Sequence, residues 1–184
     1  MNKLAVLVSR TGTNLRAMHA YGLEIALVVA DRTCPGLTFA REQNIPCILL
    51  ERTDFSSSFD RYAYTKNLTH LVRQHNITLI AMAGFATILD TPLFDAYPGK
   101  ILNTHPSLLP AFKGASAVRD ALAYGVKVTG CTIHIATLAL DSGPILAQHP
   151  VLVHESDTEA SLHQRIKEAE YRLYPAIIAN MLCS

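Results

Sequence analysis

Short apolar runs alternate with segments of helical periodicity along most of the chain. The apolar runs lack a polar face, which is typical of strands covered on both sides of a parallel sheet. The predicted strands are Leu4–Ser9, Ile25–Ala30, Cys47–Leu50, Leu79–Ala83, Ile101–Asn103, Val128–Thr137 and Ile145–Val153. The predicted helices between and after them are Thr13–Ala20, Leu37–Gln43, Phe59–His75, Ala115–Tyr124 and Asp157–Leu182.

The last predicted helix has a start signal and an internal break signal. Ser156 and Glu159 have the spacing of a capping box, in which each side chain binds a free backbone N–H of the first turn. Pro175 lacks a backbone donor, so it is predicted to kink or restart the helix.

The alternation of strands and helices predicts an α/β fold, a doubly wound, mostly parallel sheet with helices on both faces and a Rossmann-like arrangement. The two later runs, near Val128 and Ile145, leave room for a strand pair that runs the other way. Neither a linker nor a repeat divides the 184 residues, so we expect a single domain over 1–184. Ligands of such sheets bind at the carboxyl ends of the strands.

Composition narrows the function classes. Because 49% of the residues are hydrophobic and 17% are charged, the chain is expected to fold. A net charge of +1 argues against nucleic acid as a partner. The four cysteines lack zinc-ligand spacing, so no zinc site is expected. Without a signal peptide or an apolar stretch of about 18 residues, no membrane partner is expected, and the predicted location is cytoplasmic.

The first strand runs into a turn rich in hydroxyl side chains. Gly12, Thr13 and Asn14 open the following helix, whose free N–H groups and positive end suit a phosphate. The turn has neither the P-loop pattern nor the dinucleotide-binding pattern. An ordinary helix cap would use the same residue types, so this alternative stays open.

The stretch KILNTHPSLLPAFKG, residues 100–114, places an amide and an imidazole two residues apart. If this segment is extended, Asn103 and His105 point to the same side. An amide and an imidazole aimed at one point are what a developing oxyanion needs in acyl transfer. The alternative is a proline-rich connector, stiffened by Pro106 and Pro110, with no catalytic role.

A carboxylate further along the chain fits the same chemistry. Asp141 leads into Ser142, Gly143 and Pro144, and from such a loop it can orient or charge His105, as the third member of a catalytic triad does. The same residues also form ordinary turns. His134, in an apolar run, is interpreted as a packed core histidine rather than a ligand when taken alone.

Several motifs resemble those of a known family. They are NTHPSLLP (103–110), His134, Asp141-x-Gly143-Pro144, SRTGTNL (9–15), MAGFATIL (82–89), Arg61 with Tyr64, and EYRLYP (170–175). Together they are similar to the folate-dependent formyltransferases, and within these to the branch that acts on glycinamide ribonucleotide. The resemblance extends from Leu4 to about Pro175.

The resemblance implies transfer of a formyl group from 10-formyltetrahydrofolate, a co-substrate, to glycinamide ribonucleotide in de novo purine (IMP) synthesis. It implies no metal, small-molecule partners only, and a monomer or homodimer. The implied catalytic residues are Asn103, His105 and Asp141. The implied substrate-binding residues are Gly12, Thr13, Asn14, Arg61, Pro106 and Glu170. The implied folate-binding residues are Phe85, Ala86, Thr87, Ile88, Asn103, Leu140 and Asp141.

The chain departs from the family pattern at several positions. Arg10 replaces the first glycine of the phosphate loop. Ala86 and Thr87 stand where Met and Arg are usual. Val118 and Tyr171 each replace a common His. These changes affect the folate and phosphate sites and leave the predicted catalytic residues in place.

Three alternatives remain. Residues 109–114, LPAFKG, also match formyltetrahydrofolate hydrolase, in which water is the acceptor, although the hydroxyl-rich first loop favours a phosphorylated substrate. Methionyl-tRNA formyltransferase shares the three catalytic residues but needs a basic face and a tRNA-binding domain. A non-catalytic phosphate-binding α/β module would need the first loop alone.

Overall fold

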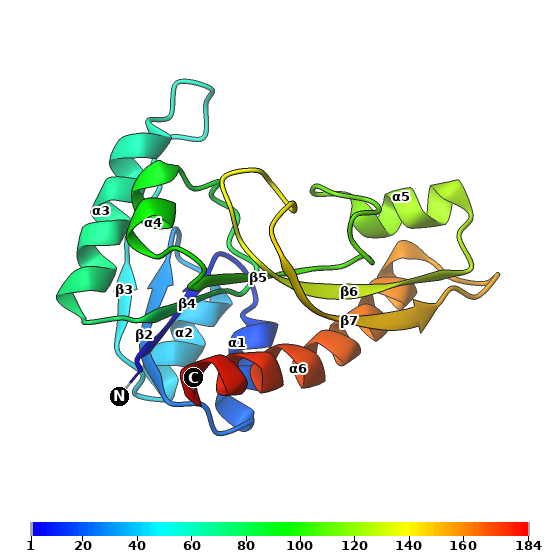
Figure 1. Ribbon diagram of the computed structural model, residues 1–184, viewed down its shortest axis with the longest axis horizontal. Coiled ribbons are helices and arrows are strands. Elements are labelled where there is room, and N and C mark those ends of the chain that lie inside the picture. The colour runs from blue at the N-terminus through cyan, green and yellow to red at the C-terminus, as the bar shows by residue number, and fades with distance from the viewer. Residues whose placement is uncertain (1, 184) are drawn as a thin grey trace.

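The computed structural model describes residues 2–183 and contains a seven-stranded sheet with helices on both faces (Figure 1). The strands are β1 (Leu4–Val8), β2 (Ile25–Ala30), β3 (Cys47–Leu49), β4 (Leu79–Met82), β5 (Ile101–His105), β6 (Val128–Ile135) and β7 (Ile145–Leu152). The helices are α1 (Thr13–Ala20), α2 (Pro35–Glu42), α3 (Arg61–Gln74), α4 (Thr91–Ala96), α5 (Ala117–Tyr124) and α6 (Glu159–Cys183).

The strand order in the sheet is β3-β2-β1-β4-β5-β6-β7. The neighbours from β3 to β5 pair in parallel, whereas β5 with β6 and β6 with β7 pair antiparallel. The predicted doubly wound, mostly parallel sheet is therefore confirmed, together with the reversed pair near its end. The winding changes direction between β1 and β4, and the crevice outside the carboxyl ends of such strands is where ligands bind.

The two faces of the sheet have separate cores because side chains alternate along each strand. Leu4, Val6 and Val8 of β1 belong to the core on the side of α1, α2 and α6. Ala5 and Leu7 belong to the core on the side of α3 and α4. A smaller cluster joins α5, β6 and the first half of α6, so α6 packs along two parts of the molecule (Figure 1).

Every predicted element is present, with its ends within two residues of the prediction. One helix, α4, was not predicted. It is short, but Asp90 accepts a hydrogen bond from the Thr91 N–H and Pro92 lies in its first turn, both of which are start signals. β5 continues two residues past the predicted end at Asn103, so His105 belongs to the strand.

The expectation that every apolar run is covered on both sides is wrong for β7. This strand lies at the edge of the sheet, and most of its residues are exposed, including Leu152 at 63%. Its apolar residues resemble those of a central strand, but within residues 2–183 no further strand lies beyond it.

Two predictions about α6 need correction. Of the predicted kink or restart at Pro175, the restart is wrong, because the helix is continuous from Glu159 to Cys183. Its cap is Thr158 rather than Ser156. The Thr158 hydroxyl accepts from the Ser161 N–H, and the Ser161 hydroxyl accepts from the Thr158 N–H, so the reciprocal pair begins two residues later than predicted.

Candidate active site

Asn103 and His105 end β5 and lie on the same face of the strand. Thr104, between them, points to the opposite face, where its hydroxyl meets Glu170 of α6. The antiparallel neighbour β6 places His134 directly opposite Asn103. The predicted amide and imidazole therefore share one side of the sheet, as the alternation of an extended strand requires.

His105 is almost completely buried, at 5% exposure, and both of its ring nitrogens face acceptors. Nε2 lies 2.8 Å from the Phe112 carbonyl oxygen, and Nδ1 lies 3.4 Å from Oδ2 of Asp141. A carbonyl oxygen only accepts, so Nε2 carries a proton. A second proton on Nδ1 gives the Asp141 carboxylate a donor, so the surroundings suit an imidazolium ion.

Asp141 lies in a strained turn that holds its carboxylate in place. Its φ of 48° is in the left-handed region, which residues other than glycine rarely adopt. Oδ2 also accepts a hydrogen bond of 2.9 Å from the Gly114 N–H. A side chain at Gly143 would overlap the Ile135 carbonyl oxygen, so the turn requires glycine there. The two loops after β5 and β6 thus meet at Asp141.

His134 contacts the predicted catalytic residues. Its Nδ1–H donates to the Ile135 carbonyl oxygen at 2.9 Å, which leaves Nε2 to accept from the Asn103 amide nitrogen at 3.3 Å. Burial lowers the pKa of His134, so the ring is neutral, and its 3.7 Å approach to Asp141 is not an ion pair. Interpreting His134 as a core histidine was therefore incomplete, because it is buried and also orients Asn103.

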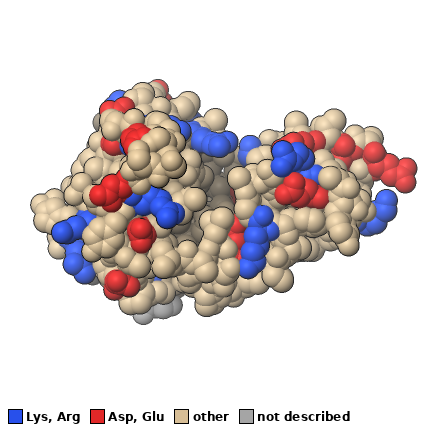
Figure 2. Space-filling model, turned by 90° about the horizontal axis from the view of Figure 1, so that it is seen from above, with Lys and Arg blue, Asp and Glu red and all other residues tan. Residues whose placement is uncertain are grey.

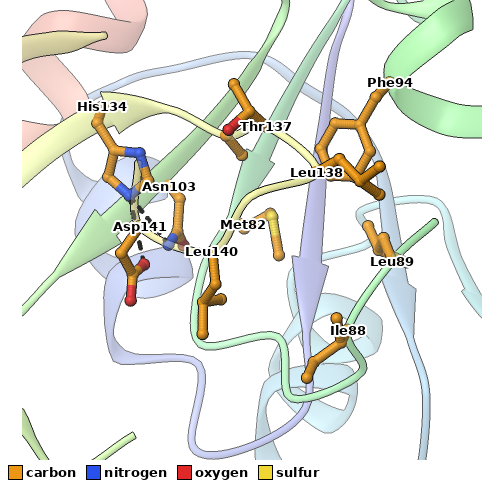
Figure 3. A pocket seen from close by; sticks show the side chains of 11 residues that line it. Met82, Ile88, Leu89, Phe94, Asn103, His134, Thr137, Leu138, Leu140 and Asp141 are labelled. Carbon is orange, nitrogen blue, oxygen red and sulfur yellow. Dashed lines mark hydrogen bonds and ion pairs between the residues drawn. The ribbon is translucent and has the colours of Figure 1, made fainter. Parts of the chain in front are cut away.

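A cavity of about 60 Å³ opens beside this cluster (Figure 3). Of the predicted folate-binding residues, the structure brings Ile88, Asn103, Leu140 and Asp141 to its wall. The remaining lining residues are Met82, Leu89, Phe94, His134, Ala136, Thr137 and Leu138. The wall is thus mainly apolar, with the amide, imidazole and carboxylate gathered on one side, as Figure 3 shows.

Phe85, Ala86 and Thr87 are outside this lining set. Thr87 is buried, and its hydroxyl donates to Oδ2 of Asp31 at 2.7 Å, so its side chain points into the protein. Phe94 was missed by the sequence reasoning because it lies on α4, the helix that was not predicted. The Asp90-Thr91-Pro92 start signal is the pattern that indicates this helix.

On the other face of β5, Glu170 of α6 is buried against α1 and β5, at 6% exposure. The Asn14 amide donates to Oε2 at 3.1 Å, and the Thr104 hydroxyl donates to Oε1 at 3.0 Å. Burial raises the pKa of Glu170, while the hydrogen bonds from Asn14 and Thr104 and the charge of Lys167 oppose that rise. Glu170, the acid predicted to bind the substrate, is thus hydrogen-bonded to Asn14 of the predicted phosphate-binding loop.

Gly12 precedes the first turn of α1 with φ at 70°, and it provides no side-chain cap for the turn. A Cβ atom at Gly12 would lie 2.6 Å from the Cα of Gly36, so the loops after β1 and β2 pack backbone to backbone. Thr13 begins the helix and is partly exposed. The Asn14 side chain faces Glu170 instead of the open turn.

Several cationic side chains lie near this turn. Burial lowers the pKa of His163 on α6, and the positive charges of Lys167 and Arg10 lower it further. Arg10 precedes Gly12 by two residues, so cationic groups of the turn and of α6 lie near one another. Seen from above, the molecule is hollowed between two lobes, with Lys and Arg on both sides (Figure 2).

The other two predicted substrate residues lie in different settings. Arg61 is exposed and begins α3, and no hydrogen bond or ion pair involves its side chain within the described part of the chain, residues 2–183. Pro106 is half-buried and directly follows His105.

Over residues 2–183, no helix is long and apolar enough to cross a bilayer, and no group of three His, Cys, Asp or Glu side chains is arranged to hold a metal.

Comparisons with known proteins agree over nearly the whole chain. A family model described as formyl transferase matches residues 2–178. A phosphoribosylglycinamide formyltransferase of Mycobacterium tuberculosis (strain H37Rv) is 42% identical over 182 residues, covering 96% of this chain and 83% of the relative. A trifunctional purine biosynthetic protein, adenosine-3, of Gallus gallus is 41% identical over an alignment of 189 positions that covers 96% of this chain and 18% of that protein.

Solved structures have the same fold. A glycinamide ribonucleotide transformylase from Geobacillus kaustophilus superposes with a TM-score of 0.91 at 34% identity, covering 99% of both chains. A phosphoribosylglycinamide formyltransferase from Streptococcus pneumoniae superposes with a TM-score of 0.90 at 34% identity, covering 98% of this chain and 99% of the other.

Proposed function

The chain belongs to the formyl transferase family, and we propose that it transfers the formyl group of 10-formyltetrahydrofolate to the amine of glycinamide ribonucleotide in de novo purine synthesis. The observation that carries this proposal is that Asn103 and Asp141 line one cavity, while His105 contacts Asp141 from behind it. The relatives named after the same reaction support the choice of substrates.

The first step needs a donor for a developing negative charge. The amine nitrogen attacks the formyl carbon, and the carbonyl electron pair moves onto oxygen to give a tetrahedral oxyanion. Asn103 uses one amide N–H toward His134, so the other remains for the oxyanion. A donor held in place before the reaction stabilises this charge without reorganisation.

His105 contributes chiefly through its charge. Its Nε2–H donates to the Phe112 carbonyl, and its Nδ1 lies 3.4 Å from the Asp141 carboxylate, so these groups favour an imidazolium on the same face of β5 as Asn103. The negative Asp141 stabilises the positive ring, which in turn stabilises the oxyanion. In the second step the oxyanion collapses and the bond to N10 of the folate breaks. The proton lost by the amine passes through water, with the help of Asp141, to N10.

The cavity supplies the apolar wall for the pterin ring. Its volume of about 60 Å³ is well below the several hundred cubic ångströms of small-molecule pockets. Leu138 and Leu140 are exposed on the loop between β6 and β7. We therefore expect this loop to move outward when folate binds, and then to cover the pterin with these side chains.

The face of β5 that Thr104 and Glu170 occupy suits the ribonucleotide. The first turn of α1 has free N–H groups for the phosphate, and Arg10 and Lys167 add positive charge. Glu170 offers the carboxylate that accepts hydrogen bonds from the rest of the substrate. Folate would then bind on the Asn103 face of β5 and the ribonucleotide on the Thr104 face. The amine would reach the formyl carbon past the end of the strand, beside Asn103.

Incubation with 10-formyltetrahydrofolate, with and without glycinamide ribonucleotide, tests this function through the release of tetrahydrofolate. We expect release that requires the ribonucleotide and is lost in Asn103→Ala. Equal release without the ribonucleotide would identify a hydrolase. No release under either condition would leave a phosphate-binding module as the remaining interpretation.

A further inference from the structure

Thr104 lies between the two predicted catalytic residues but faces the other side of the sheet. Its hydroxyl donates to Oε1 of Glu170 at 3.0 Å, while Asn14 donates to Oε2 at 3.1 Å. Each carboxylate oxygen is therefore held by a donor from a different element, β5 on one side and α1 on the other. With only 6% of Glu170 exposed, water does not replace either donor easily.

Both the charge and the orientation of a buried carboxylate depend on such hydrogen-bond donors. Removing it from water favours the protonated form, and each hydrogen bond to the ionised form opposes this effect. For Glu170 the opposing groups are Asn14, Thr104 and the positive charge of Lys167. Without the Thr104 hydroxyl, Oε1 would lose its donor, and Glu170 would take up a proton at a higher pH.

We propose that Thr104 is a positioning residue, whose hydroxyl keeps the Glu170 carboxylate ionised and aimed at the acceptor substrate. This inference rests on the proposed function, because it assigns the acceptor substrate to the Glu170 side of β5. It adds a role for the residue between Asn103 and His105, so that one strand serves formyl transfer with one face and substrate recognition with the other.

Three substitutions test the hydroxyl. Thr104→Val keeps the shape of the side chain and removes its donor, and Thr104→Ala removes the donor with a smaller side chain. Thr104→Ser keeps a donor and should rescue the effect. Thr129→Val is the matched control: Thr129 is 2% exposed on the neighbouring β6, and within residues 2–183 its hydroxyl has no hydrogen-bond partner.

The first measurement is independent of the substrate. The carboxyl carbon of Glu170 is followed by ¹³C NMR against pH in the ligand-free protein, and Glu170→Gln identifies its signal. We expect the pKa of Glu170 to rise in Thr104→Val and Thr104→Ala, and to stay at the wild-type value in Thr104→Ser and Thr129→Val. An unchanged titration in the Val and Ala variants would overturn the inference.

The second measurement is steady-state kinetics with glycinamide ribonucleotide. Loss of a hydrogen bond to a charged group should raise KM for the ribonucleotide about ten-fold in Thr104→Val, with a smaller change in kcat. As pH falls, the variant should lose affinity at a higher pH than the wild type. Equal kinetic losses in Thr104→Val and Thr129→Val would overturn the role in substrate positioning. If the wild-type protein does not use the ribonucleotide, the proposed function fails, while the NMR titration still decides whether Thr104 sets the charge of Glu170.

Discussion

His134 faces Asn103 across β5 and β6 with an unprotonated ring nitrogen, 3.3 Å from the amide nitrogen. Burial lowers the pKa of His134, and its other nitrogen donates to the Ile135 carbonyl oxygen, so Nε2 can only accept. The His134 ring therefore fixes the orientation of the Asn103 amide, with the amide nitrogen toward Nε2. An amide turned the other way would present an oxygen, and thus a repulsive group, to the oxyanion.

This relationship predicts the behaviour of His134→Phe, which keeps a flat ring and removes the acceptor. With Asn103 free to rotate, we expect kcat to fall roughly 10- to 100-fold while folate affinity changes little. Stopped-flow or steady-state assays give kcat, and fluorescence titration gives the folate Kd. A kcat within two-fold of the wild-type value would remove His134 from the positioning of Asn103.

Asp141→Asn tests the charge that faces His105. An amide is similar in size to the carboxylate but cannot stabilise an imidazolium, so we expect a loss of roughly 100-fold or more in turnover. Folate and ribonucleotide binding, measured by calorimetry, should persist. Asp120→Asn, at an exposed carboxylate on α5, controls for the loss of a negative charge elsewhere. Turnover within a few-fold of wild type in Asp141→Asn would exclude Asp141 from the mechanism.

What the sequence predicts well is local in the chain. The pairing of Asn103 and His105 on one face follows from strand alternation alone, and the parallel sheet follows from alternating apolar runs. The side-chain directions of Thr87 and Asn14 follow from partners that are far away in the sequence, Asp31 and Glu170. No local pattern contains this information.

The errors in the predicted elements have separate causes. β7 was interpreted from its apolar residues, but it also contains Gln148, His149 and Pro150, and a proline within a strand is typical of an edge. The α6 cap was predicted from the spacing of Ser156 and Glu159, but Thr158 and Ser161 form an equivalent reciprocal pair two residues later. In α6, packing of Tyr174 and Pro175 against the core outweighs the helix-breaking tendency of proline.

Glu170→Gln should separate stability from function. Because the folded-state pKa of Glu170 is raised, its contribution to stability is present below the unfolded pKa and is lost as pH rises through the folded pKa. Ionisation of Glu170 in the folded protein therefore costs stability, and a neutral glutamine avoids this cost. Glutamine can accept from Thr104 and, after rotation of the Asn14 amide, donate to Asn14 Oδ1, a buried atom without a partner within residues 2–183.

We therefore expect Glu170→Gln to unfold at an equal or higher temperature than wild type at pH 7, with the advantage shrinking toward pH 4. The same variant should show a raised KM for glycinamide ribonucleotide and an unchanged KM for folate, because loss of a charge-assisted contact costs about 1.5–3 kcal/mol. Thermal unfolding across this pH range and steady-state kinetics check both parts. A clear loss of stability at pH 7, or a folate defect, would contradict the placement of Glu170.

Arg10 tests how the chain binds the substrate phosphate. Glycine is usual at this position in the family, whereas here an exposed arginine precedes α1 and its charge, with that of Lys167, acts on His163. The Arg10 carbonyl oxygen accepts from the Gly36 N–H at 3.0 Å, so the backbone is already fixed and the side chain is the part free to contact a ligand. We expect its guanidinium to form a charge-assisted contact with the phosphate. Arg10→Gly and Arg10→Gln should then weaken ribonucleotide binding, more at low salt than at high salt because an exposed pair is screened.

Calorimetric titration at two ionic strengths measures this loss, and Arg10→Lys, which keeps the charge, should retain most of the affinity. NMR titration of His163 supplies an internal control, since removal of the positive neighbour should raise the pKa of His163 in both neutral variants and leave it unchanged in the Lys variant. If the pKa of His163 rises as expected but the ribonucleotide binds the Gly and Gln variants as tightly as wild type at low salt, Arg10 lies near α6 without reaching the phosphate. The phosphate would then be held by the first turn of α1 and by Lys167 alone, and the arginine would be a tolerated replacement for glycine.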